Sequence, residues 1–411
     1  MIVTSKVIYK FKFACELNGK HIHMPAKEWF LFLQTSHIPR GQKSSLLTNY
    51  SYFRNYSQLT FPKIHFAFPM NSHLQTSLIK FSITSLFFLS AILCQAQQGP
   101  TVRKDVPLDS IRLSDPFILA DQKTQQYYMT GTGGMLWKSK DLKSWEGPYR
   151  VTETDPDSWM GPRPMIWAAE LFDYQDKYYY FATFTNRDVK IDTVAGNVIE
   201  RRASHVLVSN EAAGPYVPME DPTYLPADKP TLDGTFWIDT DGKPYMVYCY
   251  EWLQNLNGTM EKIELKPDLS GSVGEGKLLF KASDSPWSRE KDANGNDVPN
   301  KVTDGPFLFH TGTGRLGMIW TSWIYDTYVQ GVVYSESGTL DGPWIHEEQP
   351  ITPANFGHGM LFTTFDNKTL MSVHSHKSVN GRTIRIPHLF EVDLTGDKLA
   401  VVGSREVGSW K

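Results

Sequence analysis

Five segments of this 411-residue chain share one pattern, in which a polar residue precedes a short apolar strand, a turn and a second, aromatic-rich strand. The segments begin at Asp115, Glu170, Asp233, Asp304 and His358, about 50 to 70 residues apart. Their turns are rich in Asp, Asn, Gly and Thr, which suit hairpins, and their strands carry residues that pack on a pleated surface. Repetition at this interval predicts blades of antiparallel strands set around an axis.

A second motif follows three of the five segments and runs from a serine to a Gly-Pro pair and an aromatic residue. Its copies are Ser139–Tyr149, Ser209–Tyr216 and Ser335–Trp344. Together the two motifs predict an all-β fold, a five-bladed β-propeller. A β-sandwich is the alternative, but it would not place a polar residue at the same point of each repeat.

The polar residues that open the five repeats are expected to meet. In a propeller the first strand of each blade lines the central channel, so equivalent residues face one another. A cap or a turn explains one such residue, but four carboxylates and a histidine around one space oppose stability, because like charges repel. Since sequences break such rules at functional sites, this ring predicts an active site built on carboxylates.

Clustered carboxylates suit the hydrolysis of a glycosidic bond. One carboxylic acid protonates the leaving oxygen, and a second carboxylate activates water or attacks the sugar directly. A third carboxylate beside the acid raises its pKa and keeps it protonated near neutral pH. The sequence therefore predicts a glycosidase whose substrate is an oligosaccharide or a polysaccharide.

The motifs around these residues resemble glycoside hydrolase family 43, the arabinofuranosidases, xylosidases and arabinanases on a five-bladed propeller. The resemblance covers Ile111 to Val402, and its matching pieces are Ser114–Phe117, Trp167–Glu170, Leu232–Thr235, Thr303–Phe307 and Gly357–Gly359. It implies an inverting enzyme that cleaves plant-polysaccharide side chains or oligosaccharides, as an α-L-arabinofuranosidase or a β-xylosidase. A retaining five-bladed enzyme acting on other sugars is an alternative.

The resemblance also implies a role for each carboxylate. Asp115 is expected to be the general base, Asp233 to modulate the pKa of the acid, and Asp304 to be the general acid. The family usually has glutamate at the last position, and aspartate places its carboxyl roughly 1.5 Å further back. Three outcomes stay open: Asp304 serves as the acid, Glu170 replaces it, or the chain is a non-catalytic carbohydrate-binding propeller. The Gly-Pro-Phe sequence kept after Asp304 favours the first outcome.

Four further assignments concern the metal and the substrate. His358 is expected to contact a structural calcium or sodium ion at the axis through water, or else to be a hydrogen-bonded core histidine. Trp167, Trp237 and Arg385 are candidates for substrate binding, against core packing for the tryptophans and solvation for the arginine. No cofactor is expected to be required for catalysis.

The N-terminal third of the chain differs from the rest. Residues 70–96 combine Lys80, an apolar stretch and a small residue at Ala96, which is the pattern of a secretory signal peptide. The stretch is too short to span a bilayer comfortably, so the mature chain is expected to have no transmembrane span. We expect export to the periplasm or the cell exterior, and the large Leu93 disfavours lipid anchoring at Cys94.

This signal divides the chain into three parts. Residues 1–69 are expected to be a gene-model extension or disordered, residues 70–96 the signal peptide, and residues 97–411 the catalytic propeller. The last part retains only Cys249, which excludes an intrachain disulfide and a cysteine-based metal site. The formal net charge of −3 gives no reason to expect nucleic acid as a partner.

Overall fold

The computed structural model describes residues 100–219, 225 and 229–404, and before them the backbone of four strands. The chain divides into two compact units, Met1–Gln98 and Gly99–Lys411. The strands of the first unit are β1 (Thr4–Phe11), β2 (Cys15–Leu17), β3 (Lys20–Ile22) and β4 (Trp29–Ser36). β1 pairs with β4 and β2 with β3, both in antiparallel fashion.

These four strands lie in residues 1–69, the stretch that we predict to be an extension or disordered, and the rest of it lies outside the described residues. The predicted signal peptide, residues 70–96, lies outside them too. Within the described part of the chain, no helix is both long and apolar enough to cross a membrane. Export and the origin of the first residues therefore stay predictions.

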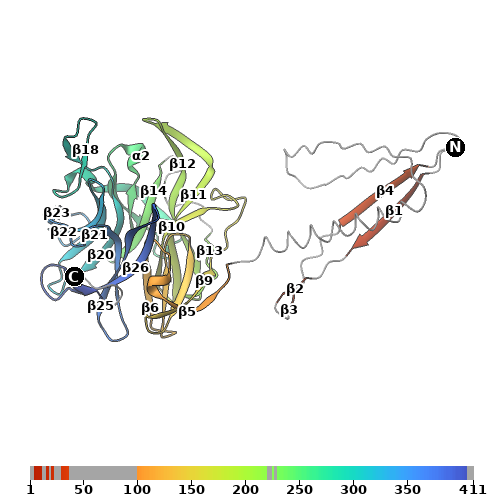
Figure 1. The fold of residues 1–411 in the computed structure, drawn as a ribbon, viewed down its shortest axis with the longest axis horizontal. Helices are drawn as coiled ribbons and strands as arrows, with labels where there is room; N and C mark the ends of the chain where they lie inside the picture. The colour runs from red at the N-terminus through yellow and green to blue at the C-terminus, as the bar shows by residue number, and fades with distance from the viewer. Residues whose placement is uncertain are drawn as a thin grey trace. The chain divides into compact units, whose positions relative to one another are not determined.

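The second unit is the five-bladed, all-β propeller that the repeats predict (Figure 1). Each blade is an antiparallel sheet whose strands succeed one another from the axis outwards. Blade 1 contains β6 (Phe117–Asp121), β7 (Gln126–Thr130), β8 (Met135–Ser139), β9 (Ser144–Arg150) and β5 (Arg103–Pro107). Blade 2 contains β10 (Met165–Tyr174), β11 (Lys177–Val194), β12 (Asn197–Ser209) and β13 (Val217–Pro218). Blade 3 contains β14 (Thr231–Ile238), β15 (Pro244–Tyr250), β16 (Thr259–Leu265) and β17 (Ser272–Lys281).

The last two blades follow the same order. Blade 4 contains β20 (Asp304–His310), β21 (Leu316–Ile324), β22 (Thr327–Ser335) and β23 (Trp344–His346). Blade 5 contains β24 (Phe356–Thr363), β25 (Thr369–Val379), β26 (Arg382–Asp393) and β27 (Ala400–Ser404). The remaining elements are the 3-10 helices η1 (Leu108–Ser110) and η2 (Ala282–Asp284), the short helix α2 (Trp252–Asn255), and the hairpin of β18 (Arg289–Lys291) and β19 (Asp297–Pro299).

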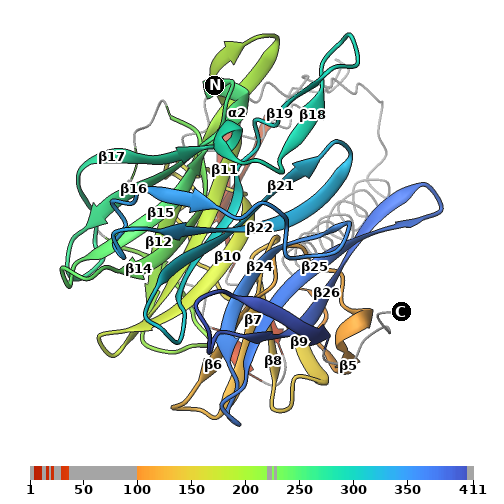
Figure 2. The ribbon, with the colours of Figure 1, turned by 90° about the vertical axis from the view of Figure 1, so that its left-hand side faces the viewer.

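The inner strands β6, β10, β14, β20 and β24 form a closed ring, because each contacts the next and β24 contacts β6. Figure 2 shows β24 of the last blade beside β6 of the first. Within the described residues these two blades share no strand, since β5 pairs with β9 and β27 with β26. The Leu113 N–H donates a hydrogen bond to the Arg385 carbonyl (3.2 Å) across this boundary. Packing and hydrogen bonds therefore close the ring.

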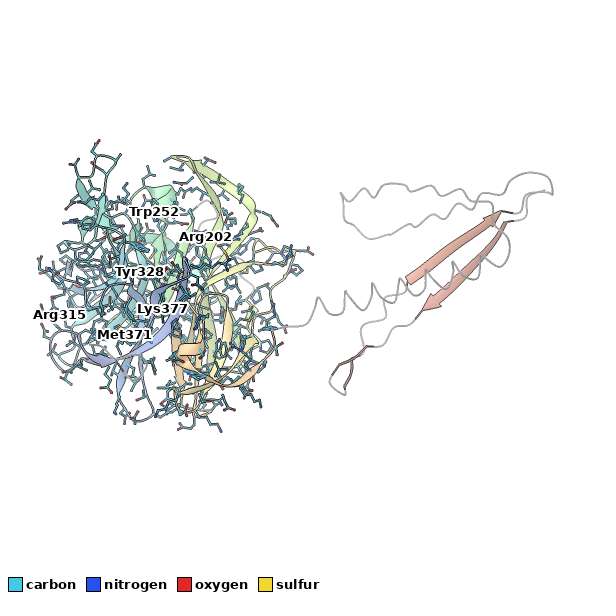
Figure 3. The ribbon with its side chains drawn as sticks, in the orientation of Figure 1. Arg202, Trp252, Arg315, Tyr328, Met371 and Lys377 are labelled. Carbon is cyan, nitrogen blue, oxygen red and sulfur yellow. The ribbon has the colours of Figure 1, made fainter. Side chains whose placement is uncertain are left out.

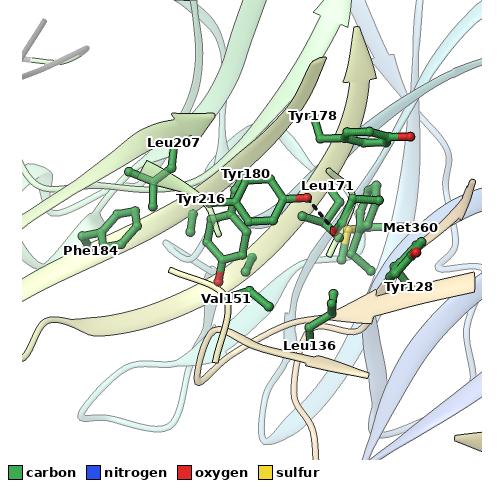
Figure 4. Close-up of a cluster of buried hydrophobic side chains, with 14 of the residues drawn as sticks. Tyr128, Leu136, Val151, Leu171, Tyr178, Tyr180, Phe184, Leu207, Tyr216 and Met360 are labelled. Atoms are coloured by element: carbon green, nitrogen blue, oxygen red, sulfur yellow. Dashed lines mark hydrogen bonds between the residues drawn. The ribbon is translucent and has the colours of Figure 1, made fainter. Parts of the chain in front are cut away.

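Five hydrophobic clusters hold the blades together, one between each pair of neighbours. Figure 4 shows the cluster between blades 1 and 2, which includes Leu136 of blade 1 and Tyr180 and Leu207 of blade 2. A sheet with two apolar faces must be covered on both, and in a ring of blades each neighbour provides that cover. The aromatic residues of these clusters serve this packing, because their large side chains fill the space between sheets.

The closing Ser…Gly-Pro-aromatic motif forms a turn at the outer edge of three blades. In blade 2 the Tyr216 hydroxyl donates to the Ala212 carbonyl (2.8 Å). In blade 4 the Trp344 indole N–H donates in the same way to the Leu340 carbonyl (3.2 Å). All three Gly-Pro peptide bonds are cis. The motif therefore fixes the aromatic side chain against the turn that precedes it.

The inner strands share one irregularity near their starts. In blades 2 to 5 their pairing with the second strand is interrupted by a β-bulge. One residue in each blade takes a positive φ there: Asp115 (56°), Ala168 (43°), Asp233 (54°), Gly305 (52°) and His358 (48°). This conformation is uncommon for residues other than glycine, and bulges re-aim side chains beside functional sites. These five residues are the structural equivalents around the ring.

This equivalence corrects the expected register. We predicted that Asp115, Glu170, Asp233, Asp304 and His358 occupy one repeat position. The prediction was wrong for Glu170, which follows the equivalent residue of blade 2 by two positions, and for Asp304, which precedes that of blade 4 by one. A bulge adds a residue to one strand only, and counting polar residues along the sequence does not reveal where it lies.

The preceding blade holds each strained residue in place. The backbone N–H of Asp233 donates to Oγ1 of Thr183 (2.8 Å), on β11 of blade 2. The backbone N–H of His358 donates to Oγ1 of Thr321 (2.9 Å), on β21 of blade 4. The left-handed conformation at the axis is therefore fixed by contacts between blades, which over-determine it.

We expect the clusters between blades to carry most of the stability of the propeller. Trp320 is fully buried between blades 3 and 4, with its ring centroid 5.0 Å from that of Trp287. The variant Trp320→Ala should lower the free energy of unfolding by about 3–5 kcal/mol, measured by chemical denaturation. Ile345→Ala, at a position that is 47% exposed, is the control and should change it by less than about 0.5 kcal/mol. Equal losses in the two variants would contradict this account.

Candidate active site

A cavity of about 430 Å³ receives side chains from all five blades. Its volume lies within the range of small-molecule pockets. Tyr328 and Trp252, which Figure 3 labels, contribute to its wall. Of the residues predicted for the site, those that line the cavity are Asp115, Asp233, Asp304, His358, Trp167 and Arg385.

His358 lies between the predicted base and the predicted acid. Its Nδ1 atom is 3.2 Å from Oδ1 of Asp115 and 2.9 Å from Oδ1 of Asp304. Burial lowers the pKa of His358, but Asp115 and Asp304, with Asp233 behind them, raise it well above its usual value. A protonated imidazole at this point offsets the repulsion between the carboxylates and lies between the two reacting groups.

The Asp115 carboxyl is held by a chain of two hydrogen bonds. Its Oδ2 atom accepts a hydrogen bond from the Thr132 hydroxyl, and the Thr132 oxygen in turn accepts one from the Ala168 N–H (3.1 Å). Burial raises the pKa of Asp115 above its usual value, while His358 lowers it. The carboxyl is therefore fixed in orientation, as a general base must be to reach a water molecule.

Two neutral histidines support Asp115. The backbone N–H of Asp115 donates to Nδ1 of His374 (3.1 Å), so this nitrogen carries no proton and makes no ion pair with the carboxylate 3.5 Å away. The proton of His374 is then on Nε2, which donates to Nε2 of His376 (3.1 Å). Burial lowers the pKa of His374 well below its usual value and that of His376 to about 4. The tautomers and the pKa shifts agree that both rings are uncharged at neutral pH.

Asp233 and Asp304 form a hydrogen-bonded carboxyl pair. Burial raises the pKa of Asp233 well above its usual value, and the adjacent Asp304 raises it further against the effect of His358. Burial also favours a higher pKa for Asp304, but His358 and hydrogen bonds from His358, Asp233 and Tyr328 lower it below its usual value. Two carboxyls this close cannot both ionise readily, so the pair holds one shared proton. That proton is available for acid catalysis.

Tyr328 makes a further contact with the acid position. Its hydroxyl donates to Oδ2 of Asp304, and its ring lies parallel to that of His376, at 4.6 Å and 9°. Burial raises the pKa of Tyr328 well above its usual value, and Asp304 and Asp115 add to that effect. The phenol therefore stays protonated over the range in which the carboxylates ionise.

Glu170, the alternative acid, does not line the cavity, which disfavours that alternative. Its side chain is buried on β10, beyond the bulge that turns the preceding residues towards the axis. Burial raises the pKa of Glu170 to about 8, and the nearby Thr235 and His358 lower it only in part. Glu170 is therefore a neutral, structural carboxylic acid at neutral pH.

Trp237 does not line the cavity either, which corrects its predicted role in substrate binding there. It lies near the far end of β14 from the bulge and packs against the ring of His310, with 5.1 Å between centroids. Trp167 does line the cavity, and the Arg202 guanidinium covers its ring at 4.2 Å while pairing with Glu251. These partners fix the plane of an aromatic surface that faces the substrate space.

Arg385 reaches the cavity from β26 with an exposed side chain. Within the described residues it forms no salt bridge, although its charge lowers the pKa of Asp115. An arginine in this state can donate several hydrogen bonds to a ligand at little desolvation cost. The contact of Arg385 with substrate stays a prediction.

The residues around the axis are compatible with the predicted ion. Nε2 of His358 is buried and has no hydrogen-bond partner in the described part of the chain. Oxygens of Asp233 and Asp304 and a nitrogen of His358 lie within 4.8 Å of one another. A protonated His358 cannot bind a cation directly, so an ion at the axis would contact it through water, and this site stays a prediction. Metal analysis of the purified protein would test this calcium or sodium site.

Sequence reasoning missed the residues that hold the carboxylates in place. Tyr328, His374 and His376 come from second or third strands, and Thr132 comes from the turn between β7 and β8, all outside the repeated polar position. The spacing of the two histidines is a signal that could have been used, because residues i and i+2 of a strand share a face. No comparable pattern marks Tyr328 or Thr132.

Comparison with known proteins agrees with this geometry. Residues 105–394 match the family model of glycosyl hydrolases family 43. The chain is 32% identical to an endo-arabinase from Bacteroides thetaiotaomicron VPI-5482, with a TM-score of 0.60, over 70% of this chain and 97% of that structure. No match was found among the curated proteins.

Two more distant structures share the fold. A thermostable family-43 glycoside hydrolase is 20% identical with a TM-score of 0.59, over 75% of this chain and 98% of that one. An α-L-arabinofuranosidase from Lactobacillus brevis is 16% identical with a TM-score of 0.53, over 74% of this chain and all of that one (100%). At these identities the likeness concerns the propeller alone.

We expect Glu170 to make stability depend on pH. Its pKa is about 8 in the folded protein and near 4.5 in the unfolded chain, so its contribution is complete below pH 4.5 and is lost as pH rises to 8. Relative to Glu170→Gln, the wild type should lose up to about 1.4 kcal/mol of unfolding free energy per pH unit between 5 and 8. Urea denaturation at several pH values measures this difference. Glu275→Gln, at an exposed position, should show no such trend, and a flat difference for Glu170→Gln would refute the assignment.

Proposed function

Because this chain belongs to glycosyl hydrolases family 43, we propose that its cavity hydrolyses arabinofuranosidic bonds with inversion at the anomeric carbon. The chain is a glycoside hydrolase, and its relatives act on plant polysaccharides. The residue roles and the sugar are the proposal. The observation that carries the roles is the contact of one His358 nitrogen with both Asp115 and Asp304 inside the cavity.

In the proposed reaction the general base and the general acid lie on opposite sides of His358. Asp115 removes a proton from a water molecule whose oxygen attacks the anomeric carbon. On the other side, the proton shared by Asp233 and Asp304 is supplied at position 304 to the leaving glycosidic oxygen as its bond to carbon breaks. Asp233 has the higher pKa of the pair and is the more buried, so it serves as the reservoir that keeps Asp304 supplied.

Arabinose is the proposed sugar because the 32% identical structure is an endo-arabinase. β-D-Xylosides are the second candidate class, and both contain a pentose that offers an apolar ring face and several hydroxyls. Trp167 supplies an aromatic surface for such a face, and Arg385 supplies hydrogen-bond donors for the hydroxyls. The alternative, a non-catalytic carbohydrate-binding propeller, is favoured only by aspartate at position 304.

Export belongs to the same proposal, since a plant polysaccharide is too large to be met inside the cell. The pattern of residues 70–96 supports it. Intact mass measurement of the protein purified from its native cells would show whether the mature chain begins after Ala96. A mature chain that still contains residues 70–96 would rule out cleavage of this signal.

We expect Asp115→Asn to abolish turnover while the fold is kept. Loss of a general base should lower kcat/KM on an aryl α-L-arabinofuranoside or on linear arabinan by about 10²–10⁴-fold. Asp176→Asn, in an exposed hairpin turn, is the matched control and should retain full activity. Unchanged activity in Asp115→Asn would remove this residue from the mechanism. No turnover by the wild type on arabinosides, xylosides or a set of plant glycans would favour the binding propeller.

Inversion predicts the configuration of the first product. Proton NMR of the early reaction mixture should show the sugar released with the anomeric configuration opposite to that of the substrate, before mutarotation. Retention would require a carboxylate nucleophile in place of an activated water molecule. It would therefore contradict the role proposed for Asp115.

A further inference from the structure

Both carboxyl oxygens of Asp304, the expected general acid, already have partners within the protein. Oδ1 of Asp304 lies 2.9 Å from Nδ1 of His358, and Oδ2 accepts the hydrogen bond of the Tyr328 hydroxyl. The side chain also bonds to Asp233. Aspartate is one methylene shorter than glutamate, so its carboxyl stands roughly 1.5 Å further from the substrate than a glutamate would. Both oxygens of Asp304 therefore already accept hydrogen bonds, and they lie further from the leaving glycosidic oxygen than those of a glutamate would.

Tyr328 is placed to extend this short side chain. It lines the same cavity as Asp304 and belongs to the same blade, on β22. Its ring is stacked on His376 at 4.6 Å and packs against Trp323 at 4.9 Å, so the phenol has one orientation. A hydroxyl is both a donor and an acceptor, and it can therefore accept one proton while it gives up another.

We propose that Tyr328 delivers the proton in this enzyme, as a relay between Asp304 and the leaving glycosidic oxygen. The inference rests on the proposed hydrolysis and concerns the same site. The Tyr328 hydroxyl bonds to Asp304 inside the cavity, and a hydrogen-bonded oxygen lies further from a carboxyl than the reach lost with the missing methylene.

The proton balance of the step is simple. The bond between the anomeric carbon and the glycosidic oxygen breaks, and its electron pair stays on that oxygen. The Tyr328 O–H turns from Asp304 to this oxygen and gives it its proton, and the phenol oxygen takes, through Asp304, the proton that Asp233 and Asp304 share. The phenol is restored within the step, and Asp233 and Asp304 are both left as carboxylates. The water activated by Asp115 supplies the new C–O bond, and its proton ends on Asp115.

The first test compares two substrates whose leaving groups differ in whether they must be protonated as they depart. A phenyl arabinoside has a poor leaving group and requires protonation, whereas a 2,4-dinitrophenyl arabinoside releases a stable anion without it. Tyr328→Phe keeps the stacked ring and removes only the hydroxyl. We expect kcat/KM of this variant to fall about 10²-fold or more on the phenyl substrate and to stay close to the wild-type value on the dinitrophenyl substrate.

Tyr325→Phe is the matched control for this experiment. Tyr325 also donates to a carboxylate, Oδ2 of Asp297 (2.7 Å), but it is exposed and does not line the cavity. Its loss should leave both substrates unaffected. Equal losses on the two substrates in Tyr328→Phe would mean that the hydroxyl only maintains the shape of the site, and would overturn the relay.

The second test restores the missing length at position 304. In the double variant Tyr328→Phe with Asp304→Glu, the added methylene takes the space of the lost hydroxyl and brings the carboxyl forward. If Tyr328 compensates for the short aspartate, this variant should regain at least about 10-fold of the activity lost on the phenyl substrate. No recovery, in a variant that still hydrolyses the dinitrophenyl substrate, would overturn the proposal. An inactive wild type would instead contradict the proposed function itself.

Discussion

The contact of one imidazole with two carboxylates makes this cavity possible. Asp115, Asp233 and Asp304 are gathered around one cavity with little of their side chains exposed, where each would raise the pKa of the others and destabilise the fold. His358 places a positive charge at Nδ1 between Asp115 and Asp304, and the remaining carboxyl, Asp233, carries the shared proton. The cluster therefore holds fewer net charges than its composition implies. A neutral residue at position 358 would leave the base and the acid in direct repulsion.

The propeller supplies the backbone geometry that this arrangement requires. Asp115, Asp233 and His358 all occupy the left-handed position near the start of the inner strand of their blades, and each N–H there is bonded to a side chain of the preceding blade. Such a conformation costs of order 1–3 kcal/mol and persists only where surrounding contacts enforce it. The ring closure and the clusters between blades provide those contacts. Packing between the blades therefore stabilises the strained backbone of these residues at the axis.

The sequence was sufficient for the fold because each blade repeats the same hairpin and the same turn chemistry, which are local properties. It was also sufficient for Asp115, Asp233 and His358, since they stand at equivalent points of the repeat. It failed for Glu170, because a bulge shifts the register by whole residues and no local signal reveals it. Trp237 was assigned by residue type alone, and its place along β14 puts it away from the cavity. Whether such side chains reach the cavity depends on how the five sheets pack together, and the sequence of a single blade does not determine that packing.

The residues that support Asp115 and Asp304 also come from the packing of several blades, so the sequence of one blade does not reveal them. Their protonation states matter for the site. A protonated histidine at position 374 would compete with His358 for Asp115 and would present no acceptor to the Asp115 N–H. Its neutral form does the opposite, since it accepts that N–H and donates its own proton to His376 in a hydrogen bond. The stack of His376 on Tyr328 then connects the support of the base to that of the acid. Two strands of neighbouring blades, β22 and β25, therefore set the orientation of both reacting groups, so base and acid keep their separation as a unit.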